Sequence, residues 1–295
     1  MLRDTINPSD RQKNYLIFTF YFQKLSQLFN GTFVQKCIVE LLTLALASMN
    51  YREIRPFGFL NNFVQSFWYY ETFDTEIQHT ILPDGYFDLI AEFENETLTT
   101  VKLTGIWTNA KDIQIPKNTK FFAIRFNLIA IEYIFQKEIK SILDSTINLP
   151  LSFWNIDKYK SNEFEKFVAD SSNKLDTSTR HLKEIDSRKL KLFEIVYKQK
   201  TKTVSEISKQ VFWSSRQINR YFHSKFGITL KQFLNIVRCN ATYEEISNGN
   251  LNPQSDFFDQ AHFIKEIKKY TGATPKELNK NKNDRFLQLS KTEVL

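Results

Sequence analysis

The stretch of sequence that decides the fold is FDQAHFIKEIKKYTGATPKEL, residues 258–278. Asp259 is a favoured helix N-cap, and Gly272 stands where a helix ends in a left-handed residue. Thr274-Pro275 then begins a further helix, because proline is favoured at the first helical position. The stretch therefore predicts short, closely punctuated helices that must pack together as a compact bundle.

The residues before this stretch carry three more helix starts and a helix stop at Gly227. At each start a Ser or Thr and a Glu or Gln three residues later can cap each other's amides: Thr203 with Glu206, Ser214 with Gln217, and Thr229 with Gln232. Ser205–Val211 and Ser214–Phe226 have the proportions of a helix-turn-helix. Its predicted buried stripe is Ile207, Val211, Ile218, Phe222 and Phe226.

Polar side chains gather on the other side of the second of these helices. Arg216, Asn219, Arg220 and His223 are spaced three or four residues apart, so they share one helix face. Arg can donate a bidentate pair to guanine, and Asn can do the same for adenine, which suits a DNA major groove. On pattern alone, an ordinary solvated amphipathic helix is the more frequent explanation of such a face.

Two runs of this region resemble the paired DNA-binding units of AraC-type transcription regulators. The run SSRQINRYFHSKFGITLKQFL, residues 214–234, resembles the first unit, and residues 258–278 resemble the second. The resemblance covers roughly residues 190–280. It implies two helix-turn-helix units joined by a long helix at about Leu230–Ser247. Their recognition helices would lie in successive major grooves, over a DNA site of about 20 base pairs.

The resemblance also implies which residues contact DNA. The base-reading positions fall on Arg216, Asn219 and Arg220 in the first unit and on Gln260, His262 and Lys265 in the second. Ala261 occupies a further reading position and offers a methyl contact to thymine. For Asp259 and His262 the alternative is an internal cap or hydrogen bond. The predicted phosphate contacts are Thr203, Ser214, Lys225, Lys231 and Lys276.

The second unit departs from the family pattern in front of its recognition helix. A full positioning helix is usual there, but this chain has SNGNLNPQSD at residues 247–256. Gly249 and Pro253 break that segment, so no regular helix is expected in it. The second unit is therefore expected to dock differently or to contribute less specificity.

The charge distribution agrees with a polyanion-binding C-terminal region. Residues 189–295 hold 19 Lys and Arg against 10 Asp and Glu, whereas residues 1–188 hold 21 against 23. The net charge of +7 therefore belongs to one end of the chain. A Lys-rich solvated surface is the alternative explanation of the same excess.

The N-terminal half is predicted to be β-rich, which makes the chain an α+β protein with a small β-barrel or sandwich, flanking helices and an all-α C-terminal region. Helices are expected at Ile129–Leu143 and Asn162–Lys174, and a polar linker at Ser171–Ser187. The predicted strands are Phe59–Tyr70, Glu76–Leu82, Tyr86–Phe93, Thr97–Ile106 and Phe121–Phe126. The predicted domains are an extension at 1–48, a sensor or dimerisation domain at 49–170, a linker at 171–188, the DNA-binding domain at 189–285 and a tail at 286–295.

Residues 56–150 resemble an uncharacterised domain that is often fused to AraC-type units, through LPDGYFDLI at 82–90 and FAIRFN at 122–127. In related regulators the corresponding domain is a cupin-like β-barrel that binds an effector or mediates dimerisation. A candidate pocket comprises Trp68, Asp84, Asp88, Trp107 and Arg125. The more frequent alternatives are that the tryptophans belong to the core and that Asp84-Gly85 is simply a turn. Arg125 either clamps an acidic ligand or forms a structural ion pair with an Asp, and the ion pair is favoured. The helix at Ile129–Leu143 is either a dimer surface or part of the core.

Enzyme chemistry has little support in the sequence. Cys37, Cys239 and the four scattered histidines have no metal-ligand spacing, and no catalytic residue or cofactor is predicted. The alternatives to a sequence-specific regulator are a sequence-indifferent DNA-binding protein and a DNA-repair alkyl transferase. The expected partners are promoter DNA, RNA polymerase, a small-molecule effector and a second copy of the chain. The expected location is the bacterial cytoplasm, with no membrane contact.

Met49 is the only methionine after Met1, and it directly precedes the recognisable domain. We therefore predict that translation starts at Met49 and that residues 1–48 are a non-native or loosely attached extension. N-terminal sequencing of the native protein should return residues from position 49 onwards. Recovery of a peptide from within residues 1–48 would contradict this prediction.

Overall fold

The computed structural model describes residues 51–180, 185–198, 203–252 and 257–280. The predicted extension at 1–48 and the predicted tail at 286–295 lie outside the described residues. Within the described ranges, none of the helices combines the length and the apolar character that a bilayer span requires.

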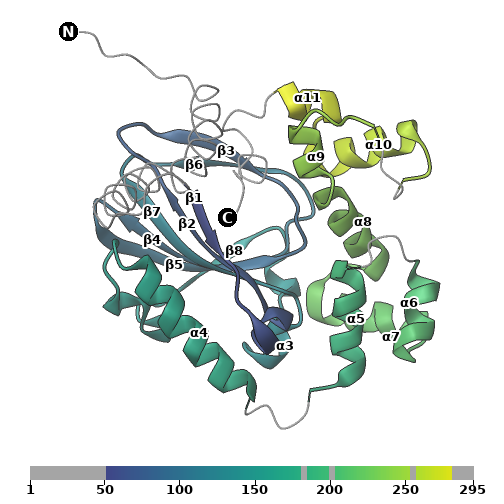
Figure 1. Ribbon diagram of the computed structural model, residues 1–295, viewed down its shortest axis with the longest axis horizontal. Helices are drawn as coiled ribbons and strands as arrows, with labels where there is room; N and C mark the ends of the chain where they lie inside the picture. Colours follow the sequence, from purple (N-terminus) through teal and green to yellow (C-terminus); the bar gives the residue numbers. More distant parts are fainter. Residues whose placement is uncertain (1–50, 181–184, 199–202, 253–256, 281–295) are drawn as a thin grey trace, which may run out of the picture. The chain divides into compact units, whose positions relative to one another are not determined.

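The N-terminal region is built on two antiparallel sheets (Figure 1). The larger sheet has six strands, in the order β1 (Tyr51–Ile54), β2 (Val64–Glu71), β7 (Thr119–Phe126), β4 (Phe87–Glu94), β5 (Thr97–Thr104) and β8 (Thr146–Leu149). The smaller sheet pairs β3 (Ile77–Ile81) with β6 (Lys111–Ile115). This arrangement confirms the predicted α+β class with an N-terminal antiparallel β domain.

Both faces of the larger sheet are covered. Successive side chains of a strand point to opposite faces, and the central strands carry apolar side chains on both. One face packs against α4 (Phe164–Arg180), where the Phe122 ring lies 5.5 Å from Phe164 and 5.6 Å from Phe167 between centroids. The other face carries a second core that includes Trp68, Phe121 and Ile115, the last from the smaller sheet. The larger sheet is therefore buried on both sides.

Three strands were not predicted: β1, β6 and β8. β6 begins with the charged pair Lys111-Asp112 and has one buried residue, Ile115. β8 has no fully buried residue. Strands at or near a sheet edge need few apolar side chains, so the alternation that predicts a half-buried strand is weak in them.

The predicted helix at Ile129–Leu143 is wrong over most of its length. Only α3 (Ala130–Tyr133) is α-helical, and a single 3₁₀ turn, η2, follows at Lys140–Ile142. The chain turns at Gln136, which has a left-handed φ of 53°. Ile131 and Ile139 are buried in the core. Core packing, the alternative to a dimer surface, therefore explains their apolar character.

The predicted linker is partly helical, since α4 continues to Arg180 and α5 begins at Ser187 and ends at Lys198. Leu175 and Thr179 within this stretch are buried. The polar composition that predicted a linker belongs to the outer face of an amphipathic helix.

The C-terminal region is all helical, as predicted, and its caps are as the sequence indicates. All three capping boxes are present, and Gly227 and Gly272 end their helices with φ of 76° and 74°. The helices are α6 (Val204–Val211), α7 (Ser215–Phe226), α8 (Leu230–Asn240), α9 (Tyr243–Ser247), α10 (Gln260–Thr271) and α11 (Pro275–Lys280).

The long connecting helix predicted at about Leu230–Ser247 is divided into α8 and α9. The Thr242 hydroxyl donates to the Cys239 carbonyl at 2.8 Å. Such a side-chain bond competes with the backbone ladder and often bends a helix. The Tyr243 hydroxyl then donates to the carbonyl of Pro83 at 3.1 Å, which ties the first residue of α9 to the β domain.

The turn between β3 and β4 packs directly against the helical region. The Tyr197 hydroxyl of α5 donates to the Gly85 carbonyl at 2.9 Å, and the Tyr86 and Tyr197 rings stack with centroids 5.2 Å apart. Gly85 has φ of +84°, and a Cβ there would lie 2.9 Å from a methyl of Val237 on α8. Only glycine allows this close approach.

Gly85→Ala should therefore destabilise the chain more than Gly272→Ala does. Gly272 has a similar φ of +74° but open space around it, so alanine there adds only the backbone cost of about 1–2 kcal/mol. Alanine at Gly85 adds overpacking of about 1–3 kcal/mol to that cost. Equilibrium urea unfolding of both variants measures the difference. Equal losses would mean that Val237 moves aside freely.

Candidate nucleic-acid interface

The first helix-turn-helix consists of α6 and α7, and its inner side is fully packed. Ile207, Val211, Ile218, Phe222 and Phe226 are all buried, which confirms the predicted stripe. The rings of Phe222 and Phe226 each lie 5.9 Å from Phe193 of α5 between centroids. With one side held in this way, the opposite side of α7 is the face available to a partner.

That outer face is positively charged. Arg216 and Arg220 are one helical turn apart and exposed, as is His223. Among the described residues, neither arginine forms an ion pair, whereas Arg188 and Lys189 of α5 do. Both guanidiniums are thus free to donate paired hydrogen bonds to an external acceptor.

Asn219, the third predicted reading residue of α7, has a structural partner. It is half-buried, and its side-chain oxygen accepts from the backbone N–H of Leu230 at 3.1 Å, at the first turn of α8. A bidentate contact with adenine requires that oxygen as an acceptor. Base reading by Asn219 remains a prediction, and it would have to share or replace this cap.

The predicted reading residues of α10 are also largely engaged within the chain. The Gln260 amide donates to the Leu251 carbonyl at 2.9 Å. Asp259 caps the helix through the His262 backbone N–H at 2.7 Å, and the His262 ring lies 5.9 Å from Phe257 between centroids. The internal roles that the sequence left open for Asp259 and His262 are therefore present. Lys265 and Ala261 remain exposed.

The segment predicted to lack a positioning helix is described over residues 247–252, where Ser247 is the last residue of α9 and no helix is found at residues 248–252. Instead, α9 ends at Ser247 and packs on α11, where the Asn279 amide donates to the Ile246 carbonyl at 2.6 Å. α10 packs through Phe263 and Ile267, which are buried. The second unit thus has its recognition helix in place without a regular helix in residues 248–252.

The predicted phosphate contacts differ in availability. The hydroxyls of Thr203 and Ser214 are both used in capping boxes, with Glu206 and Gln217 respectively. The Glu206 carboxylate would repel a phosphate at the start of α6. Lys231 and Lys276 are exposed and Lys225 is half-buried. The lysines are therefore the stronger candidates, and all of these contacts remain predictions.

The candidate pocket of the β domain is occupied by its own ion pairs. Arg125 lies opposite Asp88 in the sheet register and pairs with Asp88 at 3.2 Å and Asp84 at 3.4 Å. The Trp68 indole also donates to Asp88, at 3.1 Å. Burial lowers the pKa of the Arg125 guanidinium, but the surrounding acidic groups, Asp88 and Asp84 foremost, together hold that pKa above its ordinary value. The structural ion pair, which the sequence favoured, is present.

Trp107 does not join this cluster through any hydrogen bond among the described residues, although it is half-buried. Cys239 is buried in α8, and burial raises the pKa of its thiol. A nucleophilic cysteine requires the opposite, a lowered pKa. Cys37 lies outside the described residues, and the described part of the chain contains no His, Cys, Asp and Glu group arranged to hold a metal.

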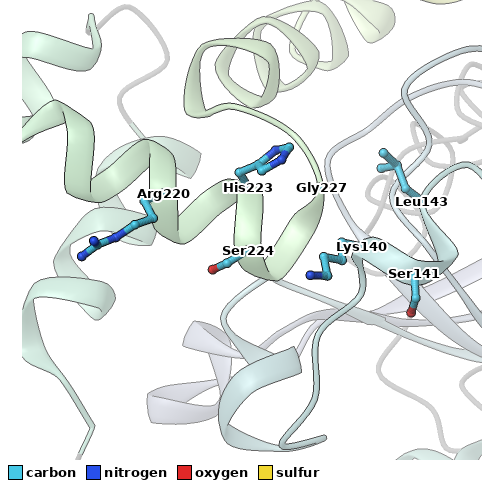
Figure 2. A pocket seen from close by; sticks show the side chains of 7 residues that line it. All are labelled: Lys140, Ser141, Leu143, Arg220, His223, Ser224 and Gly227. Carbon is cyan, nitrogen blue, oxygen red and sulfur yellow. The ribbon is translucent and has the colours of Figure 1, made fainter.

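One lysine beside α7 could not be identified from the sequence. A pocket of about 600 Å³ is lined by Lys140, Ser141, Leu143, Arg220, His223, Ser224 and Gly227 (Figure 2). Lys140 falls in a stretch that was predicted as a continuous helix, and its contact with α7 depends on the turn that replaces that helix.

Two family models match the chain. Residues 52–148 match a domain of unknown function, DUF6597, and residues 207–281 match a helix-turn-helix domain. No curated protein sequence matches. Among solved structures, a ToxT structure from Vibrio cholerae is 12% identical and covers 78% of this chain and 97% of its own, with a TM-score of 0.38. ToxT from Vibrio cholerae O395 bound to (E)-4-(8-methylnaphthalen-1-yl)but-3-enoic acid is 10% identical, with coverage of 82% and 100% and a TM-score of 0.41.

Asn219→Ala should lower the free energy of unfolding by about 1 kcal/mol, because the Leu230 amide loses its partner at a helix N-terminus. Asn219→Asp is the matched control, since it keeps an acceptor oxygen and adds a favourable charge at the start of α8. Urea unfolding of the two variants provides the measurement. Full stability of Asn219→Ala would mean that the side chain is available for DNA alone.

Proposed function

We propose that this AraC-type DNA-binding transcription regulator, in which a DUF6597 domain precedes the helix-turn-helix region, recognises its promoter sequence chiefly through α7. The observation that carries the proposal is the pair Arg216 and Arg220. They are exposed one turn apart on a helix whose other side is buried. An Arg bidentate to guanine is the commonest specific contact in the major groove.

The two recognition helices have unequal roles in this proposal. α7 presents two guanidiniums with no internal partner among the described residues, whereas Gln260 and His262 of α10 are hydrogen-bonded within the chain. α10 then contributes a phosphate contact from Lys265 and a methyl from Ala261 that can touch thymine. Sequence preference should be strong in the α7 half of a site of about 20 base pairs and weak in the other half.

The side chains of the β domain indicate its role less clearly than those of α7 do. The cluster around Arg125 satisfies its own charges, so it supplies no free clamp for an acidic effector in this conformation. A small-molecule effector, a second copy of the chain and RNA polymerase remain predictions of the sequence. The buried, high-pKa thiol of Cys239 disfavours alkyl transfer at that residue.

The proposal is tested by selecting bound fragments from sheared genomic DNA and then measuring variants on the recovered site. Arg220→Ala should cost about 1–3 kcal/mol of discrimination at one base pair and leave the other positions unchanged. Lys276→Ala, which removes an exposed charge from α11, serves as the control and should weaken all sequences alike. Uniform weakening by Arg220→Ala as well would identify a sequence-indifferent binder and contradict the proposal.

A further inference from the structure

The pocket beside α7 joins the β domain to the recognition helix. Its β-domain side is the turn that contains Lys140, Ser141 and Leu143, and its other side is the last turns of α7. Figure 2 shows Lys140 beside the last turn of α7, with Arg220, His223 and Ser224 projecting from the same helix. The lining therefore includes one residue proposed to read bases and one lysine from a different domain.

Two contacts fix Lys140 at this place. The backbone N–H of Ile139 donates to the carbonyl of Lys225, in the last turn of α7, at 2.8 Å. Gly227 ends α7, and a Cβ at Gly227 would lie 3.2 Å from the Cβ of Lys140. The backbone next to Lys140 is thus held against the helix end, so the ammonium group can reach only a small region beside α7.

The pocket is cationic and contains no acid. Lys140 and Arg220 are exposed, and neither forms an ion pair among the described residues. The nearby Glu138 carboxylate accepts from the Ser141 backbone N–H at 3.1 Å. Lys140 also offsets the partial negative charge at the C-terminal end of α7, which by itself would repel an anion.

We propose that Lys140 of the β domain binds a DNA backbone phosphate at the edge of the major groove that α7 enters. The inference rests on the proposed function, because it assumes that the Arg216 and Arg220 face meets DNA. A strand that passes over Arg220 and His223 reaches the pocket next. A compact ammonium on a flexible stem suits a phosphate oxygen and reads no base.

The test compares Lys140→Gln with Lys137→Gln in the full chain. Lys137 is an exposed lysine of the same segment that does not line the pocket. Binding is measured by fluorescence anisotropy on the recovered site and on a scrambled duplex at several salt concentrations. Lys140→Gln should weaken binding to both duplexes about five-fold near 0.15 M salt and reduce the slope of log K against log salt by about 0.9. Lys137→Gln should leave both unchanged.

The ratio of affinities for the two duplexes separates this inference from the proposed function. A wild-type chain that does not prefer the recovered site overturns sequence-specific recognition, yet a slope change confined to Lys140→Gln still supports the phosphate contact. Identical slopes for wild type and Lys140→Gln overturn the contact while leaving sequence recognition intact. A thermal shift with inorganic phosphate that Lys140→Gln abolishes, at unchanged DNA slopes, would assign the pocket to a free anion and overturn the DNA contact.

Discussion

The packing of the helices on the β domain depends on the buried ion pairs of Arg125. A buried guanidinium is tolerated only when carboxylates surround it, and Asp84 and Asp88 supply them. Asp84 belongs to the turn whose neighbouring carbonyls, those of Pro83 and Gly85, accept from Tyr243 and Tyr197. The turn that neutralises Arg125 through Asp84 therefore also forms the surface on which α5, α8 and α9 pack.

Glu132 of α3 provides a second set of contacts with the helices. Its carboxylate accepts from the Tyr221 hydroxyl of α7 at 2.9 Å and pairs with Lys189 of α5 at 2.5 Å. One acidic residue thus holds two helices of the DNA-binding region. Glu132 and the backbone hydrogen bond from Ile139 to Lys225 both hold α7 against the β domain, and the face of α7 that carries Arg216 and Arg220 remains exposed.

Most of what the sequence could predict about the C-terminal helices was local. Capping boxes join residues three positions apart, so Ser214 and Gln217 identify the start of α7 without tertiary information. The spacing of Ile131 and Ile139 predicted one helix. Both residues are buried, but by separate turns of the chain, and residues buried in this way can have the spacing of one helical face. The partner of Asn219 could not be predicted, because Leu230 lies in the next helix and contributes only a backbone amide. The pairing of Arg125 with an Asp followed from the cost of burying an arginine.

The absence of a side chain at Gly227 limits which front domains can be combined with this α7. Because its missing side chain admits Lys140 and Leu143 against the end of α7, the recognition helix and the β domain fit each other as one pair of surfaces. Exchange of the front domain for an unrelated one would leave this end of α7 without its neighbour, even if every residue of α7 were kept. Recombination between such genes would thus be constrained where α7 meets the β domain.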